Sequence, residues 1–143
     1  MSPARDDNPR VVFDTNVYVS AIVFGGTPEI LFDMARSNEI KLLVSRPILL
    51  EVSRILFRKL KIERHTVLEA VSEIRRISEL IVPKKRLHQI KEDEPDNRIL
   101  ECALEGHADA IITGDKKHIR VLGQFEGIPI YLPAEYIKQN RSR

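Results

Sequence analysis

The chain has a single cysteine, Cys102, among its 143 residues. One cysteine excludes an internal disulfide, and such a count is typical of proteins in the reducing cytosol. The four histidines are scattered and no spaced cysteines accompany them, which excludes a zinc site of the Cys/His type. A metal site in this protein must therefore use oxygen ligands.

Long hydrophobic runs are also missing. The longest near-apolar run, from Val17 to Phe24, is far too short to cross a bilayer. The polar N-terminal stretch MSPARDDNPR lacks the apolar segment of a signal peptide. We therefore expect a cytoplasmic protein with no membrane contact.

Aromatic residues are few, and they do not alternate with basic residues as on a base-stacking surface. Positive charge, in contrast, is concentrated in the middle of the chain. Between residues 41 and 91, thirteen Lys and Arg stand against five Asp and Glu, so this stretch carries +8 and the remainder −6. This distribution fits a polyanion-binding face beside a group of carboxylates, although ordinary solvated helix faces would produce the same charge run.

Predicted strands alternate with predicted helices along the chain. Short apolar runs predict strands at residues 10–13, 41–44, 80–82, 108–113 and 128–131. Helical spacing predicts helices at residues 27–38, 45–56, 64–79, 95–105, 116–122 and 134–139. This order indicates an α/β fold whose parallel sheet has helices on both faces. With no linker or repeat, we expect one domain over residues 1–143, with a core at 10–137 and flexible tails at 1–9 and 138–143.

Four acidic residues are expected at one edge of this sheet. Asp14 and Asp115 each follow a strongly apolar predicted strand, at its carboxyl end. Glu51 lies one turn into the helix after the second strand. Asp96 lies in the first turn of a helix that must begin at the carboxyl edge, because it returns the chain to the start of the strand at 108–113. Chain connectivity alone therefore brings the four acids to one rim.

Each acid also fits a structural role when it is taken alone. Asp14 fits a loop cap, Asp96 and Asp115 fit helix N-termini, and Glu51 fits a solvated position beside Arg54. Together, however, the four carboxylates would repel one another unless protons or cations neutralised them. Oxygen ligands select hard ions, Mg²⁺ or Mn²⁺, which commonly also bind substrate phosphates. Carboxylates beside a basic surface therefore suggest phosphodiester hydrolysis.

Four stretches of the sequence carry a family resemblance and cover roughly residues 10 to 137. They are VVFDTNVYVSAI, SRPILLEVSRIL, DEPDNRILECALEGHADAIITGDKKHI and GIPIYLPAEYI. The DTN after a strand, the PDN that opens a helix and the ITGD after another strand are specific in combination. With them the chain resembles the PIN-domain ribonucleases, in the group of toxin components of toxin–antitoxin systems.

The resemblance implies a three-layer α/β/α sandwich around a mostly parallel sheet of about five strands, with the strand from Val11 central and next to the strand from Ala108. It implies that Asp14, Glu51, Asp96 and Asp115 form the catalytic, metal-binding set, which is complete in this chain. It further implies a homodimer and a cognate antitoxin that blocks the cleft.

Other polar residues extend this hypothesis. Asn16 and Thr113 are predicted to orient the carboxylates or a phosphate oxygen, with ordinary turn chemistry as the alternative. Arg46 and Arg54 are candidates for substrate contact, and each would equally serve as the ion-pair partner of an acid.

These residues lead to the hypothesis of a Mg²⁺- or Mn²⁺-dependent endoribonuclease acting on accessible single-stranded RNA. It would leave a 5′-phosphate and a 3′-hydroxyl, because the 2′-hydroxyl takes no part. A non-catalytic protein that binds nucleic acid or a partner is one alternative. A phosphatase of the haloacid dehalogenase type is another, but it needs a second acid where this chain has Asn16.

Overall fold

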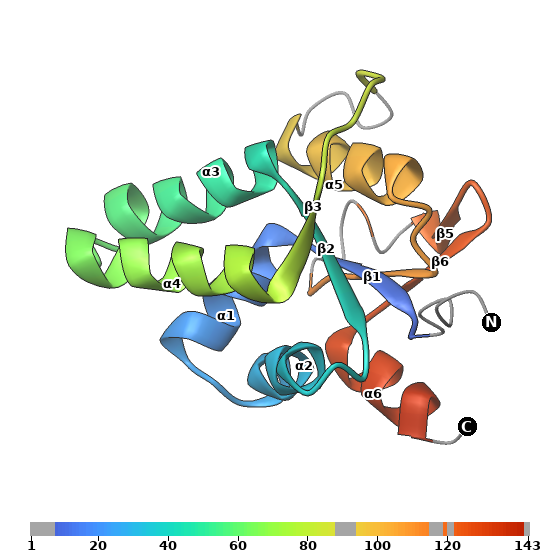
Figure 1. The fold of residues 1–143 in the computed structure, drawn as a ribbon, viewed down its shortest axis with the longest axis horizontal. Helices are drawn as coiled ribbons and strands as arrows, with labels where there is room; N and C mark the ends of the chain where they lie inside the picture. The colour runs from blue at the N-terminus through green and yellow to red at the C-terminus, as the bar shows by residue number, and fades with distance from the viewer. Residues whose placement is uncertain (1–7, 88–93, 115–118, 120–121, 142–143) are drawn as a thin grey trace, which may run out of the picture.

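The fold is a six-stranded sheet between two layers of helices, as a computed structural model shows (Figure 1). The structure describes residues 8–87, 94–114, 119 and 122–141. Five strands pair in parallel and one short strand runs antiparallel to its neighbour. The predicted α/β class, with a mostly parallel sheet of about five strands, is confirmed.

The elements follow one another in the alternating order expected of parallel sheets. The strands are β1 (Arg10–Phe13), β2 (Lys41–Ser45), β3 (Ser78–Ile81), β4 (Ala110–Ile112), β5 (Gln124–Phe125) and β6 (Ile128–Tyr131). The α-helices are α1 (Thr15–Val23), α2 (Thr27–Arg36), α3 (Arg46–Arg54), α4 (Arg64–Ile77), α5 (Glu94–Glu105) and α6 (Pro133–Arg141). A π-helical turn, η1 (Ile55–Lys59), continues α3.

The strand order is β3-β2-β1-β4-β6-β5, which places β1 in the interior of the sheet between β2 and β4. The predicted pairing of β1 with the strand expected at residues 108–113, which is β4 in the structure, is therefore confirmed, with Phe13 opposite Ile112. Because these strands are parallel, the residues that follow them, Asp14 and Thr113, meet at the same carboxyl edge.

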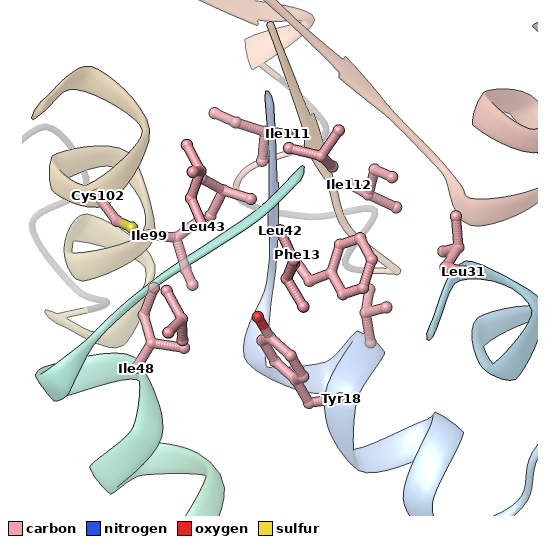
Figure 2. Packing of buried hydrophobic residues seen from close by; sticks show 14 of the residues in the cluster. Phe13, Tyr18, Leu31, Leu42, Leu43, Ile48, Ile99, Cys102, Ile111 and Ile112 are labelled. Atoms are coloured by element: carbon pink, nitrogen blue, oxygen red, sulfur yellow. The ribbon is translucent and has the colours of Figure 1, made fainter. Parts of the chain in front are cut away.

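The hydrophobic core fills both faces of the sheet. Figure 2 shows Ile48, Ile99 and Cys102 on one side of the strands and Phe13 and Leu31 on the other. All five side chains are buried. The core therefore holds α3 and α5 on one face and α2 on the opposite face.

Some observed helices and strands differ from the predicted ones, because the hydrophobic periodicity of the sequence does not mark them clearly. Helix α1 was not predicted: its sequence TNVYVSAIV is apolar nearly throughout and has no clear polar face, because it is largely buried. The helix predicted at 64–79 ends at Ile77, and β3 begins at Ser78 rather than at residue 80. Strand β5 was also missed. The short helix predicted at 116–122 lies mostly outside the described residues.

No single helix in the described part of the chain is long and apolar enough to cross a membrane. Helices α1 and α2 reach that length and composition only as a pair, and a bend of 100° separates them.

Two ionisable side chains, the Cys102 thiol and the Tyr18 hydroxyl, are buried in the core. Burial raises the pKa of the Cys102 thiol from 9.0 to about 12, although a hydrogen bond with Ser45 opposes the shift. Burial also raises the pKa of Tyr18 well above 10.0. The Tyr18 hydroxyl has no hydrogen-bond partner among the described residues. Both groups therefore remain protonated in the folded protein at neutral pH.

We expect this arrangement to make the fold sensitive to alkali. The unfolded chain releases the Cys102 proton near pH 9, whereas the folded chain holds it to about pH 12, so the free energy of unfolding falls between these values. The loss approaches about 1.4 kcal/mol per pH unit for each such group. Denaturant midpoints from pH 7 to 10.5 should fall less steeply in Cys102→Ala. Equal slopes in the two proteins would contradict the expectation.

Candidate active site

Asp14 is the centre of the candidate site, directly after the interior strand β1. Its side chain is 3% exposed, which is unusual for a carboxylate. Its backbone N–H donates to the carbonyl of Ile112 at 2.8 Å, and the Thr113 hydroxyl donates to Asp14 Oδ2 at 2.6 Å. Strand β4 and Thr113, the residue directly after it, therefore position the backbone and the carboxylate of Asp14.

Thr113 is itself fully buried, and its N–H donates to the carbonyl of Tyr131 in β6 at 2.9 Å. This second bond fixes the residue whose hydroxyl contacts Asp14. The sequence singled out Thr113 for such a position, and its part in catalysis stays a prediction.

Removing the Thr113 hydroxyl should leave the orientation of the Asp14 carboxylate less well fixed, while the carboxylate itself stays in the site. The hypothesis of a metal-dependent nuclease predicts that Thr113→Val, which preserves the side-chain shape, lowers activity or metal affinity about 10- to 100-fold, as for residues that orient metal ligands. Thr113→Ser should retain most of the activity, since it keeps the donor. Metal titrations of the rate for the three proteins would show the difference. Equal loss in Thr113→Ser and Thr113→Val would contradict a role for the hydroxyl.

Asp96 is the third residue of α5, in its first turn, and is also buried. The partial positive charge of a helix N-terminus stabilises a carboxylate at this position. Thr15, which follows Asp14, and Pro95, which precedes Asp96, line the same cavity of about 330 Å³. Two segments far apart in the sequence, each with a buried acid, therefore border one cavity.

Glu51 lines this cavity from α3. Its carboxylate accepts two hydrogen bonds from Arg54, at 2.9 and 2.8 Å, in a bidentate ion pair. The pairing raises the pKa of Arg54, so the guanidinium stays charged. Arg54 thus contacts an acid of the candidate site directly, which was one of the two roles that the sequence left open for it.

The remaining predicted residues are placed differently. Asn16 is exposed in the first turn of α1, and Arg46 is exposed at the start of α3. Asp115 lies outside the described residues, directly after the exposed Gly114. The structure therefore brings Asp14, Thr113, Asp96 and Glu51 to one edge of the sheet and leaves Asp115 as a prediction.

Sequence reasoning missed Arg86 and Arg98, which line the same cavity. Arg98 is buried and pairs with the buried Glu101 at 2.9 Å. Arg-x-x-Glu within an otherwise apolar helix pattern was an available signal, because residues three apart lie on one helix face. Arg86 carried no signal beyond its place in a basic run.

The donor chemistry of the described acids suits a hard divalent cation. The two buried carboxylates of Asp14 and Asp96 offer only oxygen, which Mg²⁺ and Mn²⁺ prefer. Among the described residues no group of three or more acidic, His or Cys side chains is close enough to hold an ion. The two buried acids therefore fit such an ion as part of a site, and Asp115 is the predicted further ligand.

The parallel sheet with buried acids at its carboxyl edge defines an α/β protein with a candidate hydrolytic site. A family model described as PIN domain matches residues 10–117. The chain is also 32% identical over 112 residues to the uncharacterized protein MJ1680 of Methanocaldococcus jannaschii, a match that covers 75% of this chain and 71% of that protein. The chain belongs to the PIN-domain family. PIN domains have a nuclease-type fold and are generally nucleases, typically metal-dependent.

Proposed function

We propose that this protein is a Mg²⁺- or Mn²⁺-dependent endoribonuclease. The observation that carries the proposal is the buried Asp14 carboxylate, held by Thr113 at the carboxyl end of the interior strand of a PIN domain. Burying a carboxylate costs free energy unless its negative charge is balanced. A bound Mg²⁺ or Mn²⁺ ion would balance that charge, because these ions prefer oxygen ligands.

The proposed ligands are Asp14, Asp96 and Asp115, with Glu51 completing the site. A bound divalent cation would activate water and neutralise charge on the phosphate. Thr113 would keep the Asp14 carboxylate in one orientation through its hydroxyl. The ion pair with Arg54 would hold Glu51 at the wall of the cavity until substrate binds.

RNA is the proposed substrate because the basic stretch between residues 41 and 91 supplies the charge that a phosphate backbone needs. A mechanism that uses water as nucleophile leaves the 2′-hydroxyl unused, so the products would carry a 5′-phosphate and a 3′-hydroxyl. Binding should weaken as the salt concentration rises.

The sequence motifs further support the proposal that the protein is the toxin of a toxin–antitoxin pair. A cognate antitoxin would cover the cleft, and the protein would work as a homodimer. Co-purification of a bound protein partner and measurement of the mass of the complex in solution would test this part separately from the cleavage chemistry.

The test of the nuclease proposal is cleavage of a labelled structured RNA by purified protein freed of any partner. Reactions with Mg²⁺, Mn²⁺ or EDTA should show cutting only with metal, and end-group analysis should find 5′-phosphate. Products with a 2′,3′-cyclic phosphate, or cutting in EDTA, would contradict the mechanism. A protein that binds RNA but cuts none with either metal would favour a non-catalytic binding domain. Turnover of a small phosphomonoester would favour the phosphatase.

A further inference from the structure

The segment of residues 82–87, which we call the strap, lies against α5 after leaving β3. The N–H of Leu87 donates to Glu101 Oε2 at 2.7 Å, and the carbonyl of Leu87 accepts from Arg98 Nη2 at 2.9 Å. Further along the helix, the N–H of Lys84 donates to Glu105 Oε1 at 3.3 Å. Backbone groups at two points of the strap are thus fixed to side chains of one helix.

The anchor at Leu87 is a buried ion pair. The side chains of Arg98 and Glu101 are only 8% and 4% exposed. A buried ion pair contributes little net stability, because removing both charges from water costs about as much as their attraction returns. Its effect here is positional, since the same two side chains bind both backbone groups of Leu87.

Anchoring Leu87 determines where the preceding residue, Arg86, lies. Arg86 is exposed and lines the cavity of about 330 Å³, together with Arg54 and Arg98. Three arginine side chains therefore border this cavity, and the described part of its lining contains the acid Glu51, which is paired with Arg54. Apolar side chains form part of the remaining wall, including Pro47, Ile48 and Leu50.

We propose that this cavity is a substrate subsite that binds the RNA phosphate next to the scissile one, with Arg86 as its phosphate-binding residue. The inference rests on the proposed ribonuclease function. Guanidinium groups match phosphate oxygens in geometry and charge, and the apolar wall suits the face of a ribose or base. The cavity begins beside Thr15 and Pro95, the chain neighbours of Asp14 and Asp96, so an adjacent phosphate would lie near the acids.

The subsite also addresses an electrostatic difficulty of the proposed nuclease. A polyanionic substrate is repelled by a group of carboxylates, and cations close to them reduce that repulsion. The strap supplies such a cation from a segment that belongs to neither the sheet nor a helix.

The test measures binding of a short single-stranded RNA in EDTA, where no metal-dependent cleavage competes. Arg86→Ala should bind about 10-fold more weakly than wild type near 0.1 M salt, and its slope of log affinity against log salt should fall by about 0.7. The matched control is Arg141→Ala, an exposed arginine in α6 that is outside both the cavity lining and the basic stretch, with less than about a 2-fold effect expected. Thermal unfolding verifies that both variants fold.

A second measurement identifies the phosphate. Each phosphate around the mapped cleavage position is replaced in turn by a neutral methylphosphonate. One adjacent replacement should weaken wild-type binding about 10-fold and leave Arg86→Ala unaffected, because the two changes remove the same contact. Additive losses at every position would overturn the subsite.

The possible outcomes separate the inference from the function on which it rests. Wild-type protein that binds and cuts RNA, with Arg86→Ala no weaker than Arg141→Ala, would overturn the subsite and leave the nuclease intact. Wild-type protein that neither binds nor cuts RNA would overturn the proposed function and the subsite with it.

Discussion

Asp14→Asn should abolish metal-dependent RNA cleavage, with a loss of at least about 1,000-fold in kcat/KM. The substitution keeps the size of the side chain and an oxygen that accepts from Thr113, so the local hydrogen bond survives. It removes the negative charge that would hold the cation. The rate with saturating Mn²⁺, measured under single-turnover conditions, is the direct readout.

The same variant distinguishes a catalytic carboxylate from a structural one. Burying a carboxylate costs free energy in the metal-free fold, so Asp14→Asn should unfold at the same or a higher denaturant concentration in EDTA. A loop-capping role predicts the opposite, a loss of stability. Retained activity would show that Asp14 is not the metal-binding acid.

Asp109→Asn is the matched control for this experiment. Asp109 precedes β4 and accepts from the N–H of Arg10 at 2.8 Å, at the amino edge of the same two strands. The chemical change is identical, but it occurs at the opposite edge of the sheet. We expect full nuclease activity in this variant, and a comparable loss in both variants would show that the effect is not specific to the site.

Breaking the Arg98–Glu101 ion pair should produce the largest loss of stability. Arg98→Met leaves Glu101 buried without its charge partner, which typically costs about 3–5 kcal/mol. The Leu87 carbonyl also loses its donor, so the strap is released at its anchor. Urea unfolding monitored by circular dichroism would measure the change in the free energy of unfolding.

Replacing both partners tests the reason for this loss. Arg98→Met combined with Glu101→Leu should recover a substantial part of the stability, because no isolated charge remains in the core. The exposed pair Asp33–Arg36 has the same three-residue spacing, and Asp33→Asn should cost less than about 1 kcal/mol. Similar losses for the buried and the exposed pair would contradict burial as the cause.

Much of the fold followed from local pattern. Strand β1 was predicted with its observed bounds, and helix α5 was predicted to within one residue at its start. Short apolar runs and 3.6-residue periodicity are properties of neighbouring residues, so the sequence shows them directly. Helix α1 was not predicted, since burial on several sides removes the polar face that marks an amphipathic helix. The boundary at Ser78 was misplaced because Ser78 and Glu79 pair with β2, a contact that local periodicity does not encode.

The candidate site likewise has features that the sequence predicts and features that only the tertiary structure shows. The sequence by itself determined that acids follow apolar strands and open a helix, and parallel connectivity was enough to assign Asp14, Asp96 and Glu51 to one edge. Only the tertiary structure decided which groups touch. The bond from Thr113 to Asp14 joins residues 99 positions apart and depends on the register of Phe13 with Ile112. The strap depends likewise on side chains of a helix that comes after it in the chain. Such contacts depend on how strands pair and how helices pack. These interactions join residues that are distant in the sequence, and they form only when the core is buried, so local sequence patterns do not encode them.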